Sequence, residues 1–528
     1  MPVDTIPGLV LAAAERDPDG VWLRTDDGTA TFAGAAGQVA RLAQRLRDLG
    51  VRHGDLVVVT TRTTPPYLLC WLALASLGAV SVPTDPAGTA GELAGLVDQV
   101  RPRLLVTDPE LMALVDAAGV TDVPELGVAS IEEIVEDWRA GDAGGDQLSI
   151  GAEADDLAAL IPTSGTTGRS KLVMQTHRAY AMAGEGFPFW MELTSADRLM
   201  TSLPLFHINA PAYSVMGSLA CGAGLVLLPR FSGSGFIDSA RRHGATEFNA
   251  IGAMLEILMR QPERPDDAET DLRLCYTGPS PTKEWQEAFE GRFGLRVVCG
   301  YAMSESPYGL IWRHGTRPFG TLGSVRQHPT LGVVNEARVV DEDGKDLGVG
   351  ETGELLLRNP VVTPGYWGMP EQTAAAIVDG WLHTGDLVTV NEDDTYTFVS
   401  RLKEVLRRRG QNMSPAEIEE TIAEHPDVRE VAVVAVPSEL TEDEVKAFVV
   451  AAPGRAPDFA ELREWTSARL SRFKVPRFWQ AVDGLPRTPT SRVAKHRLPT
   501  GHPPEEYDAE AADTGAVNKP DDQTEDGP

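Results

Sequence analysis

Short strand patterns alternate with helical patterns through the first 400 residues of this 528-residue chain. A helical pattern at 40–49 is followed by a β-branched run at 55–61, an apolar helix that runs into a strand at 67–82, and a further strand pattern at 104–108. Strands that alternate with helices in this way are typical of parallel, doubly wound sheets. We therefore expect an α/β fold whose large N-terminal domain contains doubly wound sheets.

Two later regions show different patterns. Short strands separated by DG, GK and GVG turns fill residues 331–358 and predict a small antiparallel, β-barrel-like part beside the doubly wound sheets. After residue 399, a capped helix that begins at Ser414, two strands at 429–438 and 444–453, and a helix at 459–470 predict a compact α+β module. We expect an N-terminal domain at 1–399 and a smaller, mobile C-terminal domain at 400–500.

The last 28 residues have the composition of an unfolded segment. Residues 501–528 hold nine acidic residues and one lysine, with almost no large apolar side chains. Such a segment buries too little apolar surface to offset the entropy of ordering it. The sequence predicts a disordered acidic tail without a chemical role.

Charge and cysteine content exclude several classes of function. The chain has 77 acidic and 47 basic residues, a formal net charge of −30, which disfavours nucleic acid and anionic lipid as partners. Its cysteines form no CxxC pair, so neither a disulfide framework nor a structural zinc site is expected; they are Cys70, Cys221, Cys275 and Cys299. The start has no basic leader, and residues 67–82 are too short to span a bilayer. We expect a cytoplasmic protein without stable membrane association.

The strongest local motif is LIPTSGTTGRSK at residues 160–171, a strand end followed by small, hydroxyl-rich residues and a lysine. Glycines allow a ligand to approach the backbone, amides and hydroxyls donate to phosphate oxygens, and Lys171 can neutralise phosphate charge. The motif is not a Walker loop, because GxxxxGK[ST] is absent. The composition alone also fits a flexible surface loop, so the phosphate role needs further support.

That support comes from motifs that follow in order and resemble the adenylate-forming superfamily of acyl- and aryl-CoA ligases, luciferases and peptide-synthetase adenylation domains. The matching segments are LIPTSGTTGRSK at 160–171, LPLFHINA at 203–210, CYTGPSP at 275–281, VCGYAMSES at 298–306, GYWGMPEQT at 365–373, GWLHTGDL at 380–387 and SRLKEVLRRRGQNMSPAEIE at 400–419. Any one of these residues alone could have a structural role. Their shared order makes coincidence improbable.

The resemblance implies a set of site residues. Tyr301 would stack on adenine, Asp386 would accept the ribose hydroxyls, and His207 would border the acyl site. The residues implied to bind ATP are Thr163, Ser164, Gly165, Thr166, Thr167, Gly168, Gly278, Pro279, Tyr301, Ser304, Asp386 and Arg401. Those implied to take part in catalysis are Lys171, His207, Glu305, Arg492 and Lys495, with Glu305 also holding Mg²⁺.

These parts imply one reaction, in which an oxyanion attacks the α-phosphorus of ATP and pyrophosphate departs. In most relatives the thiol of coenzyme A then takes the activated acid. The resemblance also implies that the C-terminal domain rotates about Lys403 between the two half-reactions, with Gly410 near the thiol channel.

The sequence departs from the family pattern at two places. Where relatives carry a Gly-Lys pair in the C-terminal domain, this chain has Ser491 and Arg492, and the planar guanidinium of arginine does not replace a compact ammonium in every role. Lys495 offers a substitute cation. In the phosphate loop, Ser170 and Leu172 replace the usual Pro and Gly.

Our leading hypothesis is an ATP- and Mg²⁺-dependent ligase that passes a small acyl or aryl acid to coenzyme A, in the manner of carnitine or crotonobetaine ligases. An alternative is the branch that activates nitrite and converts an aromatic amine to a diazo compound in secondary metabolism, such as antibiotic biosynthesis. A further alternative is a non-catalytic nucleotide-binding relative. The expected partner is a small-molecule acid or aromatic amine.

Overall fold

The computed structural model describes residues 4–122, 126–135, 137–139, 148–163, 171–278, 281–341, 343–402, 406–408, 411–413, 415–437, 443–486, 493, 495, 498–503 and 505–514. The described residues up to Leu402 form one compact unit, and those from Leu406 onward form a second. Each unit has its own hydrophobic core. None of the helices in the described ranges has the length and apolar character that a bilayer-spanning segment needs.

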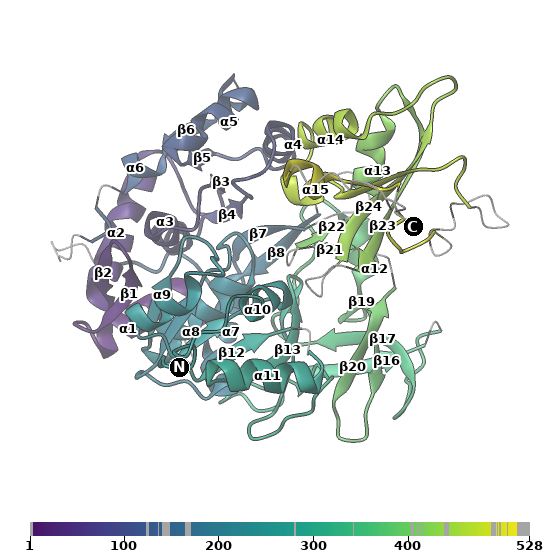
Figure 1. The fold of residues 1–528 in the computed structure, drawn as a ribbon. Coiled ribbons are helices and arrows are strands. Elements are labelled where there is room, and N and C mark those ends of the chain that lie inside the picture. Colours follow the sequence, from purple (N-terminus) through teal and green to yellow (C-terminus); the bar gives the residue numbers. More distant parts are fainter. Residues whose placement is uncertain are drawn as a thin grey trace, which may run out of the picture. The chain divides into compact units, whose positions relative to one another are not determined.

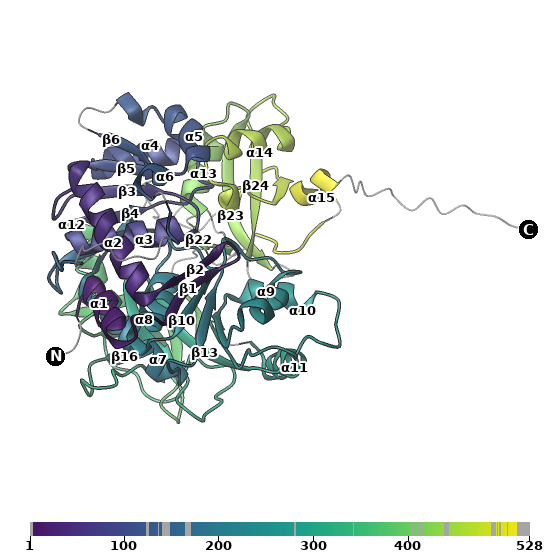
Figure 2. The same ribbon diagram turned by 90° about the vertical axis from the view of Figure 1, so that its left-hand side faces the viewer.

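The first sheet of the large unit is parallel except at one edge. Among the described residues its strands follow the order β6 (Gly127–Ser130), β5 (Leu104–Thr107), β3 (Leu56–Thr60), β4 (Val80–Pro83), β7 (Leu157–Thr163) and β8 (Lys171–Thr176). Only the β7–β8 pair is antiparallel. Helices near this sheet in both ribbon views (Figures 1 and 2) are α3 (Pro65–Leu77), α4 (Ala90–Val100), α5 (Met112–Ala117) and α6 (Ile131–Ile134).

Local sequence explains how α3 leads into β4. The Thr64 side chain accepts a hydrogen bond from the Tyr67 amide at the helix start, and Pro65 occupies the first turn. The helix ends at Gly78, whose φ of 69° is in the left-handed region that favours glycine. Because α3 is apolar on every side and buried from Tyr67 to Leu77, it is a core helix, as the sequence predicted.

The second sheet of the large unit has a parallel centre and antiparallel ends. In the described residues its order is β15 (Ser324–Val325), β14 (Ser306–Ile311), β13 (Arg296–Met303), β12 (Leu274–Thr277), β11 (Glu247–Asn249), β9 (Arg198–Thr201), β10 (Gly224–Leu227), β1 (Val21–Thr25) and β2 (Gly28–Thr31). The pairs from β13 across to β1 are parallel. The remaining helices of this unit are α1 (Ile6–Arg16), α2 (Phe32–Asp48), α7 (His177–Met191), α8 (Met216–Cys221), α9 (Phe236–His243), α10 (Gly252–Met259), α11 (Lys283–Phe293) and α12 (Pro370–Ala376), and the π-helix η3 (Ala210–Val215) precedes α8.

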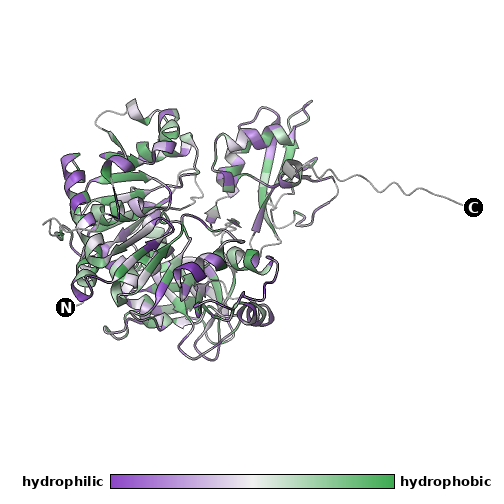
Figure 3. Ribbon diagram, turned by 60° about the vertical axis from the view of Figure 1, so that its left-hand side comes forward, coloured by the Kyte–Doolittle hydropathy of each residue, from purple (hydrophilic) through white to green (hydrophobic). Residues whose placement is uncertain are grey.

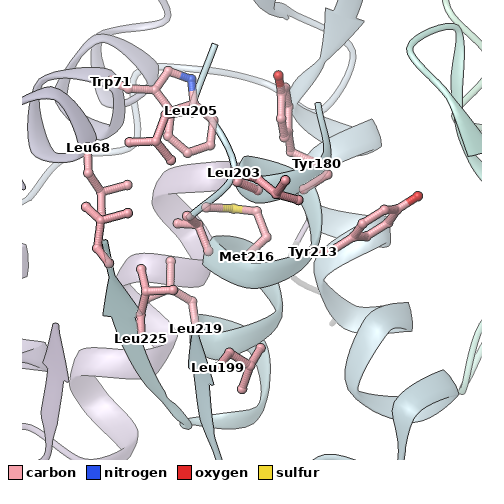
Figure 4. Packing of buried hydrophobic residues seen from close by; sticks show 14 of the residues in the cluster. Leu68, Trp71, Tyr180, Leu199, Leu203, Leu205, Tyr213, Met216, Leu219 and Leu225 are labelled. Atoms are coloured by element: carbon pink, nitrogen blue, oxygen red, sulfur yellow. The ribbon is translucent and has the colours of Figure 1, made fainter. Parts of the chain in front are cut away.

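Apolar strands and helices bury one large core in this unit. The strands are largely hydrophobic in Figure 3, whereas many helices carry hydrophilic residues. Figure 4 shows the packing of side chains from α3, β9, α8 and β10 at the centre of the core, where Trp71 and Met216 lie among the leucines Leu68, Leu199, Leu203, Leu205, Leu219 and Leu225. This core fixes the strand ends from which the candidate site is built.

The third sheet is antiparallel, as predicted for residues 331–358. Among the described residues β16 (Glu336–Val340), β17 (Thr352–Arg358), β19 (Trp381–Val390) and β18 (Ile377–Val378) follow in order, and β20 (Tyr396–Arg401) pairs with β19. The pairing of β19 with β20 sets Asp386 directly opposite Arg401.

The second unit is an α+β module. Its described elements are β21 (Leu406–Arg408), β22 (Gln411–Met413), α13 (Pro415–Ala423), β23 (Val428–Pro437), β24 (Asp443–Ala451), α14 (Phe459–Ser467), the 3-10 helix η4 (Arg472–Lys474), β25 (Phe478–Ala481), β26 (Tyr507–Asp508) and α15 (Ala509–Thr514). One sheet runs in the order β23, β24, β25, β26. Ser414, the predicted helix cap, lies outside the described residues.

The prediction of disorder from Gly501 onward is wrong for residues 505–514. Tyr507 and Asp508 pair with β25, and the Asp508 carboxylate accepts hydrogen bonds at 2.9 and 3.0 Å from the Arg477 guanidinium. Glu506 forms an ion pair of 2.5 Å with Lys446, whose side chain is fully buried. Composition could not reveal these partners, because they lie 31 and 60 residues earlier in the chain. Residues 515–528 are outside the described part.

Candidate active site

The ends of the predicted phosphate loop meet where β7 and β8 pair. Thr163 is opposite Lys171 in the antiparallel register, and the Thr163 hydroxyl donates to the Lys171 carbonyl oxygen at 3.3 Å. The predicted loop residues between these ends lie outside the described residues; they are Ser164, Gly165, Thr166, Thr167 and Gly168. The pairing of Thr163 with Lys171 therefore fixes the two ends of the predicted phosphate loop, with the lysine at the start of β8.

A second segment, residues 363–367, packs along β8. The Met174 amide donates to the Gly365 carbonyl at 3.0 Å, and the Trp367 amide donates to the Leu172 carbonyl at 2.9 Å. Gly365 has a φ of 136°, and a Cβ there would lie 2.3 Å from the Thr373 side chain. Only glycine fits such a position without strain. The backbone is thus fixed where Tyr366 meets Lys171.

Tyr366 connects Lys171 to Glu305. The Lys171 ammonium lies 4.5 Å from the centre of the Tyr366 ring, and the Tyr366 hydroxyl donates to Glu305 Oε1 at 2.9 Å. Burial and the neighbouring Glu305 carboxylate raise the pKa of Tyr366, so its phenol is protonated at neutral pH. A cation, a neutral phenol and a carboxylate from three distant segments are therefore in consecutive contact.

The turn that carries Glu305 is held by β8 and by the 363–367 segment. Gln175, at 0% exposure, donates through Nε2 to the Ser304 carbonyl, and the Thr363 amide donates to the Glu305 carbonyl at 2.7 Å. The Thr363 hydroxyl donates in turn to the Met174 carbonyl at 2.6 Å. These contacts lock the backbone and leave the Glu305 carboxylate half-exposed.

Tyr301 and Asp386 form the second pair of the site. The Tyr301 hydroxyl donates to Asp386 Oδ2 at 2.7 Å, and the Asp386 amide donates to the Thr384 hydroxyl at 3.1 Å. Asp386 is only 1% exposed. Tyr301 and Glu305 are four residues apart on the β13–β14 hairpin, so one hairpin links the Tyr301–Asp386 pair to the Lys171–Tyr366–Glu305 chain.

Gly278 directly follows β12, and His207 lies in the segment after β9, which β11 separates from β12 in the sheet. A Cβ at Gly278 would come 2.4 Å from the Gly300 carbonyl oxygen, so the close approach of β12 to β13 requires glycine. His207 Nε2 is buried without a hydrogen-bond partner among the described residues, and burial lowers the His207 pKa to about 4. The imidazole is therefore neutral at pH 7 and able to exchange a hydrogen bond with a ligand.

The other predicted residues lie outside the described part of the chain, belong to the second unit, or are described only by their backbone. Five of them are outside the described residues, namely Pro279, Lys403, Gly410, Ser491 and Arg492. Lys495 belongs to the second unit, where its ammonium pairs with Glu419 Oε1 at 2.6 Å. Of Arg401, the structure describes only the backbone opposite Asp386.

The sequence reasoning missed Tyr366, Gln175 and Thr363. Tyr366 lies within the motif GYWGMPEQT, but no local spacing connects it with residues 171 or 305. Gln175 carried no signal in the sequence, since it lies at an interior position of a strand.

The arrangement fits a nucleotide with its metal ion. In the described ranges no cluster of three or more His, Cys, Asp or Glu side chains forms a metal centre. A Mg²⁺ site does not require such a cluster, because this ion is commonly held by one or two carboxylates together with substrate phosphates and water. Glu305 would supply such a carboxylate and Lys171 a cation for phosphate, and Asp386 would supply a carboxylate that accepts hydrogen bonds from hydroxyl groups.

Comparison with known proteins identifies relatives over most of the chain. A model of the AMP-binding enzyme family matches residues 10–367, and a model of the AMP-binding enzyme C-terminal domain matches residues 417–492. A crotonobetaine/carnitine–CoA ligase of Salmonella paratyphi C is 31% identical over 487 residues, which cover 89% of this chain and 92% of the relative.

Solved structures of similar proteins have the same fold. The amide bond synthetase McbA from Marinactinospora thermotolerans matches with a TM-score of 0.83 and 26% identity, over 93% of this chain and 98% of that chain. ATP-bound MatB from Rhodopseudomonas palustris matches with a TM-score of 0.67 and 27% identity, over the same 93% and 98%. The expected α/β architecture with a smaller C-terminal domain is confirmed.

Proposed function

The chain belongs to the AMP-binding enzyme family, and from that premise we propose that it is an ATP- and Mg²⁺-dependent ligase that activates a small acyl or aryl acid and transfers it to coenzyme A. The resemblance to adenylate-forming enzymes is confirmed by the match to this family. The acid, the acceptor and the residue roles are our proposal.

The observation that carries the proposal is the consecutive contact of Lys171, Tyr366 and Glu305. Tyr301, on the same hairpin as Glu305, bonds Asp386 on β19. Lys171 would neutralise phosphate charge, and Asp386 would accept the ribose hydroxyls in place of the Tyr301 hydroxyl. Mg²⁺ held by Glu305 would supply positive charge to the phosphate oxygens. In this proposal Lys171 and Asp386 serve opposite ends of one nucleotide, the phosphates and the ribose.

The chemistry follows in two displacements. A carboxylate oxygen attacks the α-phosphorus of ATP, and the bond between that phosphorus and the bridging oxygen breaks, so that pyrophosphate leaves with the electron pair. The coenzyme A thiolate then attacks the carbonyl carbon of the mixed anhydride, and AMP leaves. Lys171 contributes by positioning and charge neutralisation, and neutral His207 contributes a hydrogen bond beside the acid.

The relatives support coenzyme A as acceptor without excluding other acceptors. The Salmonella relative is named as a CoA ligase, whereas the structural neighbour McbA is named as an amide bond synthetase. Betaine acids, named for the Salmonella relatives, are one substrate class to test. The pyrophosphate-release assay described next also distinguishes the nitrite-dependent reaction and a non-catalytic role from the proposed reaction.

The test is ATP-dependent pyrophosphate release with a panel of neutral, anionic and betaine acids, each with coenzyme A, with an amine, or with no acceptor. The proposal expects release that requires an acid and Mg²⁺, and an acyl-CoA product. Lys171→Gln should abolish most of the release, whereas Lys345→Gln, at an exposed lysine of the same unit, should not. Release that requires nitrite and an aromatic amine but ignores coenzyme A would overturn the proposal, as would ATP binding without any release.

A further inference from the structure

Arg326, which directly follows β15, places a positive charge deep inside the large unit. It is 1% exposed, and its guanidinium carbon lies 4.8, 5.1 and 5.3 Å from the ring centres of Trp190, Tyr213 and Tyr276. The aromatic faces that could hold a cationic ligand in this region are thus already in contact with a cation of the protein.

The guanidinium has neutral partners. Its Nη1 donates to the Tyr213 hydroxyl at 2.8 Å and to the Pro307 carbonyl at 3.2 Å, and its Nη2 donates to the Tyr276 hydroxyl. Its Nε donates to the Leu310 carbonyl at 3.0 Å. No carboxylate of the described residues forms an ion pair with it. Hydrogen bonds satisfy the N–H groups but leave the net charge uncompensated, and a buried charge acts over longer range than an exposed one.

Two carboxyl groups on neighbouring elements do not pair with Arg326. Glu185 on α7 is paired with His328 at 2.9 Å. Glu247 on β11 is fully buried, and both of its oxygens lack a hydrogen-bond partner in the described part of the chain. Burial raises the pKa of Glu247 well above its usual range and so favours the neutral form of this side chain.

Arg326 lies between the segment assigned to the acid and the segment assigned to the nucleotide. On one side, Tyr276 neighbours Asn249 in the parallel register of β11 and β12, so both side chains share a face of the sheet. Asn249 Nδ2 donates at 2.8 Å to Asn209, two residues after His207. Asn249 is fully buried, and its Oδ1 has no partner among the described residues.

On the other side, Gly300 immediately precedes Tyr301. A Cβ at Gly300 would lie 2.9 Å from Arg326 Nη2 and 2.9 Å from the Tyr276 ring. Figure 4 shows the Tyr213 hydroxyl turned away from the leucine cluster that lines the other side of its ring. The Tyr213 and Tyr276 hydroxyls therefore meet at the cation, and the β11–β12 register connects Tyr276 to Asn249, which bonds Asn209.

We propose that Arg326 makes the acid site selective for charge: the site accepts small acids that are neutral or anionic beyond their reacting carboxylate and rejects acids that carry a quaternary ammonium group. This inference rests on the proposed function and narrows its substrate class. Asn249 Oδ1 provides an acceptor for a hydroxyl or neutral amino group on such an acid.

Two isosteric sets of acids test the proposal. The aromatic set is 4-tert-butylbenzoate, 4-(trimethylammonio)benzoate and terephthalate, and the aliphatic set is 5,5-dimethylhexanoate, 4-(trimethylammonio)butanoate and glutarate. Within each set the shape is similar and the distal charge is 0, +1 or −1. Binding is measured by calorimetry on the full-length protein, and pyrophosphate release is measured separately.

The proposal expects the wild type to bind at least one neutral acid about tenfold or more tightly than its cationic isostere, the size expected for like charges several ångströms apart in a partly shielded site. Arg326→Lys should keep this preference and Arg326→Met should reduce it severalfold. The proposal would be overturned if the wild type bound either cationic acid more tightly than its neutral isostere. It would also be overturned if the wild type bound neither of the neutral acids. If Arg326→Met does not fold, the wild-type comparison decides alone. A charge preference without pyrophosphate release would contradict the proposed function and not this inference.

Discussion

Replacement of Tyr366 by phenylalanine tests the contact that joins the phosphate lysine to the metal carboxylate. The substitution removes the hydroxyl that donates to Glu305 Oε1 at 2.9 Å but keeps the ring that lies 4.5 Å from the Lys171 ammonium. Glu305 would then lose its orienting donor while Lys171 keeps its ring contact. Tyr366→Leu removes both interactions, so the two variants separate the two contacts.

The expected size follows from the chemistry of each contact. A hydrogen bond to a charged group contributes about 1.5–3 kcal/mol, which corresponds to roughly ten- to hundredfold in rate at about 1.4 kcal/mol per factor of ten. The lysine–ring contact adds about 0.5–2 kcal/mol. We therefore expect Tyr366→Phe to lower the rate of acid-dependent pyrophosphate release about tenfold or more, and Tyr366→Leu to lower it severalfold further.

The assay is the initial rate of pyrophosphate release as a function of Mg²⁺ concentration at saturating ATP and acid. Because Tyr366 acts through Glu305, Tyr366→Phe should raise the Mg²⁺ concentration needed for half-maximal rate. Tyr396→Phe removes a phenol hydroxyl from β20 of the same unit and serves as the control, with thermal unfolding to confirm that each variant is folded. A folded Tyr366→Phe protein with wild-type rate and Mg²⁺ dependence would refute the positioning role.

Three other predictions concern binding and stability. Asp386→Ala should raise the KM for ATP, because the ribose hydroxyls lose an acceptor at a cost of about 1–3 kcal/mol; an unchanged KM in steady-state kinetics would count against the assignment. Burial lowers the pKa of His177 to about 4, so the folded state binds fewer protons than the unfolded state between pH 4 and 6.5, and stability falls as pH drops through that range. In urea unfolding, the wild type should lose about 2 kcal/mol more than His177→Gln between pH 7 and pH 5, and equal losses would show that His177 is not the cause. Glu506→Gln should destabilise the second unit by about 3 kcal/mol because it leaves the buried Lys446 charge unpaired, whereas the exposed neighbour Glu505→Gln should leave the unfolding midpoint unchanged.

Local patterns in the sequence predicted most of the fold. The helix and strand at residues 67–82 could be read from a run of apolar residues ended by Gly78, and β16 and β17 from turn residues between β-branched runs. The order of motifs also indicated the family, because each motif keeps its own local spacing. These features depend on neighbours in the chain, so they need no knowledge of tertiary contacts.

Long-range partners could not be predicted in the same way. Tyr366 contacts Lys171 across 195 residues and Glu305 across 61 residues, and no periodicity encodes either contact. The segment at 505–514 is acidic and polar, yet the buried partner of Glu506 and the guanidinium that binds Asp508 hold it against the second unit. Arg326 gave no signal either, since its aromatic neighbours come from α7, η3 and β12.

A crystal structure of the protein with ATP and Mg²⁺ tests the central claim most directly. The account predicts one nucleotide whose ribose hydroxyls are within hydrogen-bond distance of Asp386, with Lys171 at its phosphates and the metal on Glu305. A nucleotide bound elsewhere, or one that reaches Lys171 while Asp386 stays bonded to Tyr301 and away from the ribose, would contradict it.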